Sequence, residues 1–218
     1  MKYKTSLIVL MLILAYAAQG QPVFQVGNLN PPVPSTVEFL HTGQEDYAYL
    51  IFPPAQGSCP LGGFELLNVN MYLELTADQV PVTFTASGGL AEAVWDQALG
   101  QFVPGPFICE GLDQVFNFTA PGLYVITVPM DDACGCLAFD EHYFLIIRYH
   151  DTFEANLPID GLPEPGIVYN DKGTGWVDMF DYIKTASGKV IIWGDTVCCA
   201  YSVGNEPGTW SEIKSLYR

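Results

Sequence analysis

Hydrophobic and polar residues alternate with a period of two along most of this chain. The clearest case is Phe64–Leu75, where one face carries Leu67, Val69, Met71, Leu73 and Leu75 and the other carries Asn68, Asn70, Tyr72 and Glu74. This period predicts a long strand with one side on the core. Leu123–Val128 and Tyr143–Tyr149 are dense in β-branched and aromatic residues, and we predict them to be the central strands of one sheet.

Shorter runs of the same kind predict the remaining strands: Val23–Val26, Val37–Leu40, Tyr47–Phe52, Pro81–Ala86, Ala91–Trp95, Gln101–Val103, Val115–Phe118, Ile167–Asn170, Trp176–Phe180 and Lys189–Trp193. Gly88-Gly89 is expected to turn the chain, and Pro104-Gly-Pro106 to end a hairpin formed by the two runs on either side of Ala98-Leu-Gly100. Turn signals at intervals of about 8–12 residues are typical of a sandwich. The pattern therefore predicts an all-β fold, a β-sandwich or jelly roll of mainly antiparallel strands, and no helical period of useful length occurs before residue 209.

The ends of the chain follow other patterns. Residues 1–20 combine basic Lys2 and Lys4 with a short apolar run and small residues, which predicts a cleaved signal peptide. Residues 21–36 are predicted to form an extended lead-in and 37–203 a sandwich domain, with 153–203 as a three-strand part docked on it. In the tail, 204–218, Thr209 and Glu212 fit a capping box for a short helix.

The charge distribution restricts the partners. The chain has a net charge of −16, and between Gln21 and Ile147 it contains 14 acidic residues and no Lys or Arg. Such a surface repels nucleic acid and anionic lipid. No segment after the leader is long and apolar enough to span a membrane, which takes about 20 residues. We therefore expect a protein that is secreted, at the cell surface or in the periplasm, with an extracellular ligand or surface partner, or partners of its own kind.

The six cysteines are the clearest structural motif: Cys59, Cys109, Cys134, Cys136, Cys198 and Cys199. An even number in an exported protein predicts disulfides, although six cysteines allow 15 pairings. We expect Cys59–Cys109, with the Cys134/Cys136 pair bonded to the Cys198/Cys199 pair. A zinc site made from the last four is disfavoured because C-x-C and C-C lack the usual spacing.

Two groups of residues are candidates for binding. Asp131, Asp132, Asp140 and Glu141 flank the Cys134–Cys136 loop and could supply oxygen ligands to Ca²⁺, the one cofactor that we consider. Aromatic residues that could stack on a sugar are Trp95, Trp176, Trp193, Trp210, Tyr182 and Tyr201. Among these we select Trp176, with Asp178 and Tyr182 nearby, as the ligand-binding group, although aromatic residues more often fill a core.

Several segments together carry a family resemblance: Glu45-Asp-Tyr-Ala-Tyr49 before Phe52, Pro104-Gly-Pro106 with Cys109, Pro121-Gly-Leu-Tyr124, Asn170–Asp178, and Ile191-Ile-Trp193 with Cys198-Cys199. In this combination the chain resembles a loose group of uncharacterised secreted β-sandwich proteins from environmental bacteria. It is also similar to bacterial pre-peptidase C-terminal jelly-roll modules, which accompany secreted enzymes. The resemblance implies an extracellular β-sandwich and brings no functional residues.

These observations leave three functional hypotheses. The first is a secreted acidic binding module that acts without covalent chemistry, for a glycan with Ca²⁺ as an option. The second is a structural or assembly component of an extracellular surface, filament or matrix. The third is a hydrolase with a carboxylate pair, which plain Asp and Glu residues would not reveal in a sequence. No catalytic motif with a recognisable local pattern is present.

Overall fold

The computed structural model describes residues 23–33, 36–182 and 188–201, with the side chains of 37–42 and 181–182 excluded. The predicted signal peptide (1–20) and the predicted tail helix (within 204–218) lie outside the described residues. No helix in the described part of the chain is long and apolar enough to cross a membrane.

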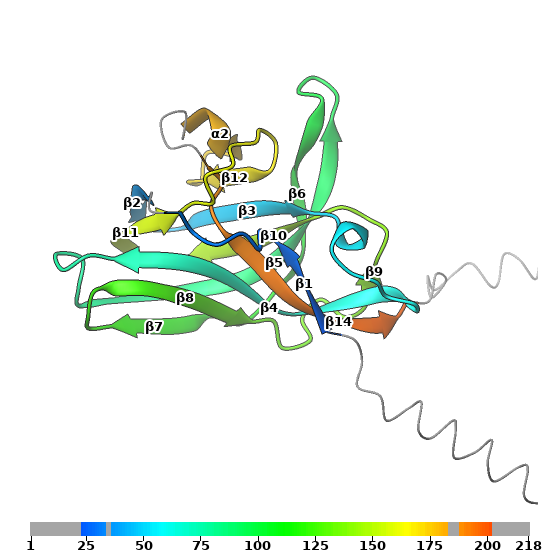
Figure 1. The fold of residues 1–218 in the computed structure, drawn as a ribbon, viewed down its shortest axis with the longest axis horizontal. Coiled ribbons are helices and arrows are strands. Elements are labelled where there is room, and N and C mark those ends of the chain that lie inside the picture. The colour runs from blue at the N-terminus through cyan, green and yellow to red at the C-terminus, as the bar shows by residue number, and fades with distance from the viewer. Residues whose placement is uncertain (1–22, 34–35, 183–187, 202–218) are drawn as a thin grey trace, which may run out of the picture.

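Two antiparallel sheets pack face to face, as predicted for a β-sandwich (Figure 1). Sheet A runs in the order β1 (Val23–Gly27), β14 (Ile192–Ala200), β4 (Gly62–Leu75), β11 (Thr152–Pro158) and β2 (Thr36–Thr42), with β8 (Gly122–Pro129) and β9 (Leu137–Ala138) also paired to β4. Sheet B runs β13 (Val177–Asp178), β12 (Val168–Asp171), β3 (Glu45–Ile51), β10 (Tyr143–Tyr149), β5 (Val82–Asp96) and β6 (Gln101–Glu110), with β7 (Gln114–Phe118) paired to β5. A 3₁₀ turn, η1 (Pro53–Ala55), and a short helix, α2 (Met179–Tyr182), complete the described elements.

The core lies between the inner faces of the two sheets. Val69, Met71, Leu73 and Leu75 of β4 are buried, which confirms the predicted alternation over this part of the strand. Leu67 is an exception because the register against β14 shifts between Asp195 and Thr196. Leu67 is the residue left over by this bulge, and it is exposed, so its predicted place on the core face was wrong.

The prediction of two central strands is confirmed for one of them only. β10 lies between β3 and β5, and all its side chains except that of Arg148 are buried. β8, by contrast, belongs to the other sheet and pairs with β4 only, with Leu123 and Val125 exposed. Composition indicates that a segment is a strand, but it does not specify the neighbours of that strand.

Gly88-Gly89 does not turn the chain, because β5 runs straight through both residues. A Cβ atom on Gly88 would lie 3.1 Å from the Met130 sulfur on the core side, and one on Gly89 would lie 3.1 Å from the Cys109 carbonyl. The glycines therefore allow close packing on both faces of the strand. The predicted turn was wrong for this reason.

Two further local predictions need correction. Pro104-Gly-Pro106 does not end the hairpin, since β6 continues to Glu110 with register shifts opposite Leu90–Ala93. Trp176–Phe180 is not one strand, since a two-residue strand is followed by helix α2. The Asp178 carboxylate accepts a hydrogen bond from the Phe180 N–H at 2.9 Å, and Asp is a preferred residue at such a helix start.

The residues after Asp151 contribute strands to both sheets. β11 pairs with β2 and β4, β12 pairs with β3, and β14 lies between β1 and β4. The short strand of the predicted lead-in, β1, is thereby paired along its length with β14. This insertion brings the end of the described chain beside its beginning, and it creates the outer face of sheet A considered below.

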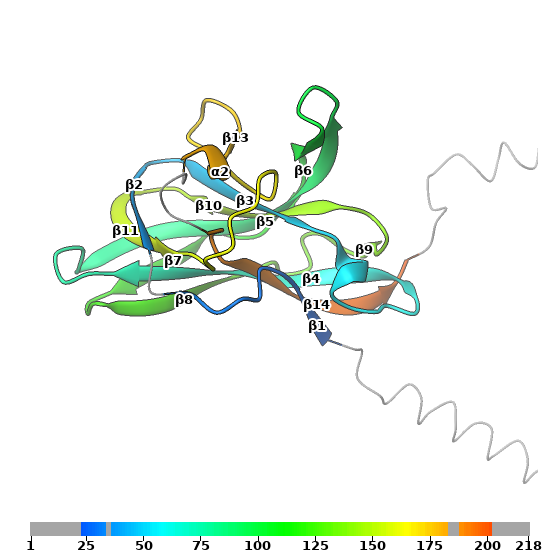
Figure 2. The same ribbon diagram turned by 45° about the horizontal axis from the view of Figure 1, so that its top comes forward.

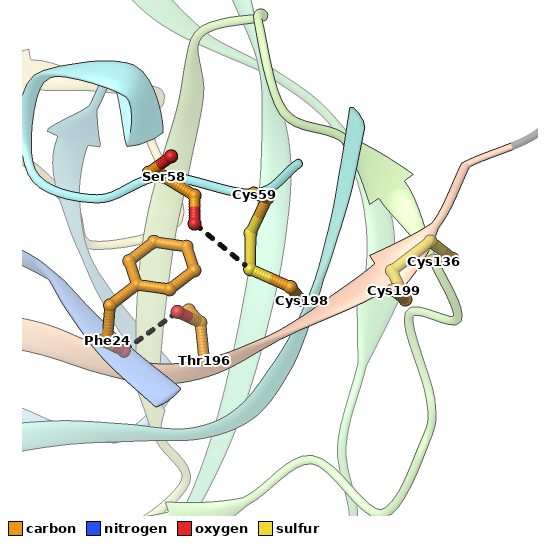
Figure 3. The surroundings of a disulfide bond; sticks show 7 residues. All are labelled: Phe24, Ser58, Cys59, Cys136, Thr196, Cys198 and Cys199. Atoms are coloured by element: carbon orange, nitrogen blue, oxygen red, sulfur yellow. Dashed lines mark hydrogen bonds between the residues drawn. A yellow bond between two sulfur atoms is a disulfide. The ribbon is translucent and has the colours of Figure 1, made fainter. Parts of the chain in front are cut away.

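All six cysteines form disulfides, as predicted, but the predicted pairing is largely wrong. The bonds are Cys59–Cys198, Cys109–Cys134 and Cys136–Cys199. Neighbouring residues of a strand point to opposite faces. Cys198 therefore points into the sandwich toward Cys59, and Cys199 points away from it toward Cys136 (Figure 3). The three bonds indicate an oxidising compartment, in agreement with an extracellular or cell-surface location.

Peptide mapping of the secreted protein without reductant tests this pairing. We expect one disulfide-linked species of four peptides, with bonds joining residues 59 with 198, 109 with 134, and 136 with 199. Because Cys198 and Cys199 share one peptide and Cys134 and Cys136 share another, fragmentation of this species is needed to assign their partners. A Cys59–Cys109 cross-link would contradict the arrangement of β14 described here.

Candidate functional site

The outer face of sheet A carries two neighbouring aromatic rings. Tyr72 points outward because Met71 and Leu73 on either side of it enter the core, and Trp193 points outward from the adjacent strand β14. Their ring centroids are 5.1 Å apart with the planes inclined at 44°. Both rings are half-buried, so each is held by its surroundings and still presents apolar surface to solvent.

A pocket of about 360 Å³ lies against these rings, and we call it the sheet A pocket. It is lined by Gln25, Asn28, Leu29, Asn30, Pro31, Tyr72, Ile191 and Trp193. Three of the eight lining side chains are amides, and none carries a charge. An aromatic surface with several fixed amides is suited to a ligand that has both apolar faces and polar edges.

The two asparagines of the pocket are both hydrogen-bonded to the buried carboxylate of Asp160. The Asn28 side-chain amide donates to Asp160 at 3.0 Å and to the Val190 carbonyl at 3.3 Å, and the Asn30 side-chain amide donates to Asp160 at 3.3 Å. The Asn28 side-chain oxygen accepts a hydrogen bond from the backbone N–H of Asn30 at 3.2 Å. These bonds fix the orientation of both amides before any ligand arrives.

Asp160 is charged and is surrounded by donors. Its carboxylate accepts the backbone N–H groups of Lys189 at 2.8 Å and Leu162 at 2.9 Å, and the Lys189 ammonium lies 3.6 Å away. Burial acts to raise the pKa of Asp160, but the backbone N–H groups, the Lys189 charge and the Asn28 amide outweigh it and hold the pKa below its usual value.

A row of hydrogen-bonded polar side chains continues from the pocket across four strands. It links Gln25 (β1), Asp195 (β14), Asn68 and Asn70 (β4) and Thr127 (β8), and we call it the polar row. The Asp195 carboxylate accepts from Gln25 at 2.7 Å and from Asn70 at 3.1 Å. Asn70 is buried and uses both ends of its amide within the row, so it acts as a support.

Other polar groups at this face remain available for a ligand. In the described part of the chain, the Tyr72 hydroxyl, the Trp193 indole N–H, the Gln25 side-chain oxygen and the Asn68 side-chain N–H have no hydrogen-bond partner. Two of these groups are donors, one is an acceptor and the hydroxyl is both. Such a mixture complements sugar hydroxyls, which also donate and accept.

The predicted group Trp176, Asp178 and Tyr182 lies elsewhere, on the outer side of sheet B. In Figures 1 and 2 the β5–β6 hairpin and the segment from β12 to α2 project from the same side of the sandwich. A groove of about 620 Å³ lies between these two projecting segments. It is lined by Trp176 and Asp178, together with Leu99, Gln101, Tyr169, Phe180 and five further residues. The structure thus brings two of the three predicted residues together, and the Tyr182 side chain lies outside the described residues.

The polar side chains of this groove are mostly engaged with other parts of the protein. Both oxygens of Asp178 accept backbone N–H groups, from Phe180 and from Gly166. The Tyr169 hydroxyl donates to the Phe102 carbonyl at 2.7 Å and accepts from Gln101 at 2.8 Å. Burial and the negative charge of Asp178 raise the pKa of Tyr169 to about 12. Its polar side chains mainly hold the two walls of the groove in place.

The acids proposed for calcium do not form a cluster. Asp131, Asp132, Asp140 and Glu141 are exposed in separate turns on either side of β9. The neighbouring carboxyl of Asp132, together with burial, raises the pKa of Glu65. Across residues 23–33, 36–182 and 188–201, no three His, Cys, Asp or Glu side chains are grouped to hold a metal ion.

A thermal melt with and without calcium tests this arrangement. Because these acids lie in separate turns and the described residues group no three of them, we expect excess Ca²⁺ to leave the melting temperature unchanged relative to Mg²⁺. A rise of several degrees with Ca²⁺ only, following its concentration, would show that a site exists after all.

A serine, a histidine and acids do meet on the outer side of sheet B. The Ser87 hydroxyl lies 3.1 Å from His150 Nε2 and donates to Glu110 at 2.9 Å, and Asp113 lies 3.2 Å from the same Nε2. A nucleophilic triad needs the acid on the opposite ring nitrogen from the serine. Ser87 is also completely buried. The group therefore lacks the geometry of that mechanism.

Comparison with known proteins gives few matches. No protein-family model matches the chain, and no curated protein matches it. The crystal structure of the cysteine protease and lectin-like domains of Cwp84, a surface layer associated protein of Clostridium difficile, is similar with a TM-score of 0.46 and 12% identity over 77% of this chain and 37% of that chain. A second structure, clostridial cysteine protease Cwp84 after propeptide cleavage, gives a TM-score of 0.46 and 13% identity over 75% and 38%.

The chain thus spans well under half the length of the solved structures that it matches. At this identity and TM-score, the likeness supports no conclusion about function. The resemblance to pre-peptidase C-terminal modules stays a prediction. The fold and the three disulfides define the class of protein to which this chain belongs: a β-rich, disulfide-bonded extracellular module.

Proposed function

We propose that this protein is a secreted binding module that recognises a glycan at the sheet A pocket. The observation that carries the proposal is the pairing of the Tyr72 and Trp193 rings with amides that are already oriented. Aromatic side chains offer a rigid apolar surface to the C–H face of a sugar ring. The unpartnered donors and acceptors around them would bond the hydroxyls at its rim.

Preorganisation favours binding at such a shallow site. Binding costs free energy for every side chain that the ligand must immobilise. Here Asn30 is fixed through Asp160 and Gln25 through Asp195, while Asn28 is buried and acts as a support. The site therefore meets the ligand with its polar groups already placed, which compensates for a small contact area.

A glycan microarray of the mature secreted protein tests this function, followed by isothermal titration calorimetry of the strongest oligosaccharides. We expect binding of a restricted set of structures, with one ligand per chain. The absence of binding that depends on Trp193 anywhere on a broad array would contradict the proposal.

One observation favours assembly as a second candidate function. β8 forms the edge of sheet A over eight residues, and its outward side chains Leu123 and Val125 are 51% and 44% exposed. An open, uncharged edge of this kind can pair with another chain. Size-exclusion chromatography with light scattering separates the candidates, because assembly through β8 predicts concentration-dependent oligomers and glycan binding does not require them.

A further inference from the structure

We infer that the sheet A pocket selects neutral glycans and excludes anionic ones, and that Asp195 is the residue that imposes this selectivity. The inference rests on the glycan-binding function proposed above and assigns its ligand class. Asp195 lies two residues after Trp193 on β14 and therefore on the same face of the strand. It is the only acidic member of the polar row.

The Asp195 carboxylate retains acceptor capacity at the surface. Each of its oxygens accepts one amide, Oδ1 from Gln25 and Oδ2 from Asn70. A carboxylate oxygen has two acceptor sites, so each oxygen can take one further donor, and the side chain is half-exposed. Two neighbouring hydroxyls of a sugar could supply those donors, whereas a carboxylate or sulfate group of a ligand could not.

Among residues 23–33, 36–182 and 188–201, no cation is placed to offset this negative charge. The described part of the chain contains three cationic residues other than histidine, Arg148, Lys172 and Lys189. Each lies in an ion pair away from the polar row: Arg148 with Asp46 and Glu110, Lys172 with Glu45, and Lys189 with Asp160 and Glu164. An anionic ligand that extends from the pocket past Gln25 onto the polar row would meet Asp195, and the described part of the chain places no compensating charge there.

The donor and acceptor balance supports the same ligand class. Recognition of an anion needs converging donors, commonly from Arg or Lys. The available groups in the described part of the chain include the Tyr72 hydroxyl, the Trp193 indole N–H, the Asn68 N–H and the oxygens of Gln25 and Asn30, with the spare acceptor sites of Asp195. Acceptors are at least as numerous as donors, which suits hydroxyl groups and disfavours acceptor-only groups.

Paired oligosaccharides test the inference. Glucose-, galactose- and mannose-based hexasaccharides are compared, each with its counterpart oxidised to the carboxylate at C6, by calorimetry at low salt. We expect the wild-type protein to bind a neutral member at least tenfold more tightly than its oxidised counterpart. In Asp195→Asn, which keeps the shape of the side chain, the neutral affinity should fall several-fold and the preference should shrink to about twofold or less.

A matched control removes the effect of net charge. Glu154 of β11 is exposed on the same outer face, and Glu154→Gln changes the charge of the protein by the same amount. This variant should keep the wild-type preference, and melting temperatures establish that both variants are folded. Two results would overturn the inference and leave the proposed glycan binding intact. One is that the wild-type protein binds an oxidised ligand through Trp193, and the other is that Asp195→Asn keeps the wild-type preference for neutral ligands. Failure of every hexasaccharide and every array glycan to bind through Trp193 would instead refute both.

Discussion

Replacing Trp193 with alanine is expected to weaken glycan binding about thirtyfold while leaving the protein folded. A sugar ring that covers roughly 80 Å² of apolar indole surface gains about 2 kcal/mol, which corresponds to about thirtyfold in Kd. Because Trp193 is on the outer face and only half-buried, the sandwich core is untouched by its removal. Calorimetry of the variant with the strongest array ligand measures the change.

The chain supplies a matched control in Trp176. This tryptophan is also half-buried, but it lines the groove on the outer side of sheet B. Trp176→Ala removes a residue of the same size and should leave the affinity within about twofold of wild type. If Trp176→Ala abolishes binding and Trp193→Ala does not, the ligand occupies the groove that the sequence pattern favoured, and our assignment of the site is wrong.

Asp160→Ala is expected to cost about 3–5 kcal/mol of folding free energy, the largest stability effect that we predict. The substitution leaves the Lys189 ammonium, 9% exposed, without its buried partner, and it also removes the acceptor of four N–H groups. Removing one member of a buried ion pair typically has this cost. In urea the midpoint should fall by about 2 M, for a slope of about 2 kcal/mol per M.

Glu164→Gln is the control for this effect. Glu164 lies 3.2 Å from the same Lys189 ammonium, but its side chain is 58% exposed. Exposed ion pairs contribute about 0–1 kcal/mol, so this variant should be nearly as stable as wild type. Equal losses in the two variants would show that the buried position of Asp160 has no special role.

The contribution of Asp160 depends on pH in a defined direction. Its pKa is lowered in the folded protein, so its stabilising effect is complete above the unfolded pKa of about 3.9 and is lost as the pH falls through the folded pKa. The stability difference between wild type and Asp160→Asn should therefore be constant near neutral pH and shrink in acid below about pH 4. A difference that grows on acidification would contradict the direction of the shift.

Local patterns predicted most of the strands because the alternation of hydrophobic and polar residues indicates, residue by residue, which side chains are buried. β4 follows this rule from Val69 to Leu75. β10, which is buried on both faces, was predicted from its β-branched and aromatic residues, and the β5–β6 hairpin, which pairs Asp96 with Gln101, from the turn residues between its strands. The rule fails where packing is non-local. The two glycines in β5 have the composition of a turn, yet they are needed where Met130 and the Cys109 carbonyl approach the strand closely.

The sequence could not show which residues of the site lie together, because that depends on how the strands pair. Trp193 was among the aromatic residues considered, and Tyr72 was placed on the polar face of its strand. Their contact depends on β14 entering sheet A beside β4, 121 positions away along the chain. The prediction of the disulfide pairing failed for the same reason. Cys198 and Cys199 point in opposite directions because they are neighbours on one strand, β14. Neither fact has a local signature.

A crystal structure of the mature protein with its strongest array ligand tests the central claim most directly. We predict a sugar ring stacked on Trp193 and Tyr72, with its hydroxyls within hydrogen-bond distance of Gln25 and Asp195. A ligand bound in the groove beside Trp176, or along the edge of β8, with the sheet A pocket empty, would contradict it.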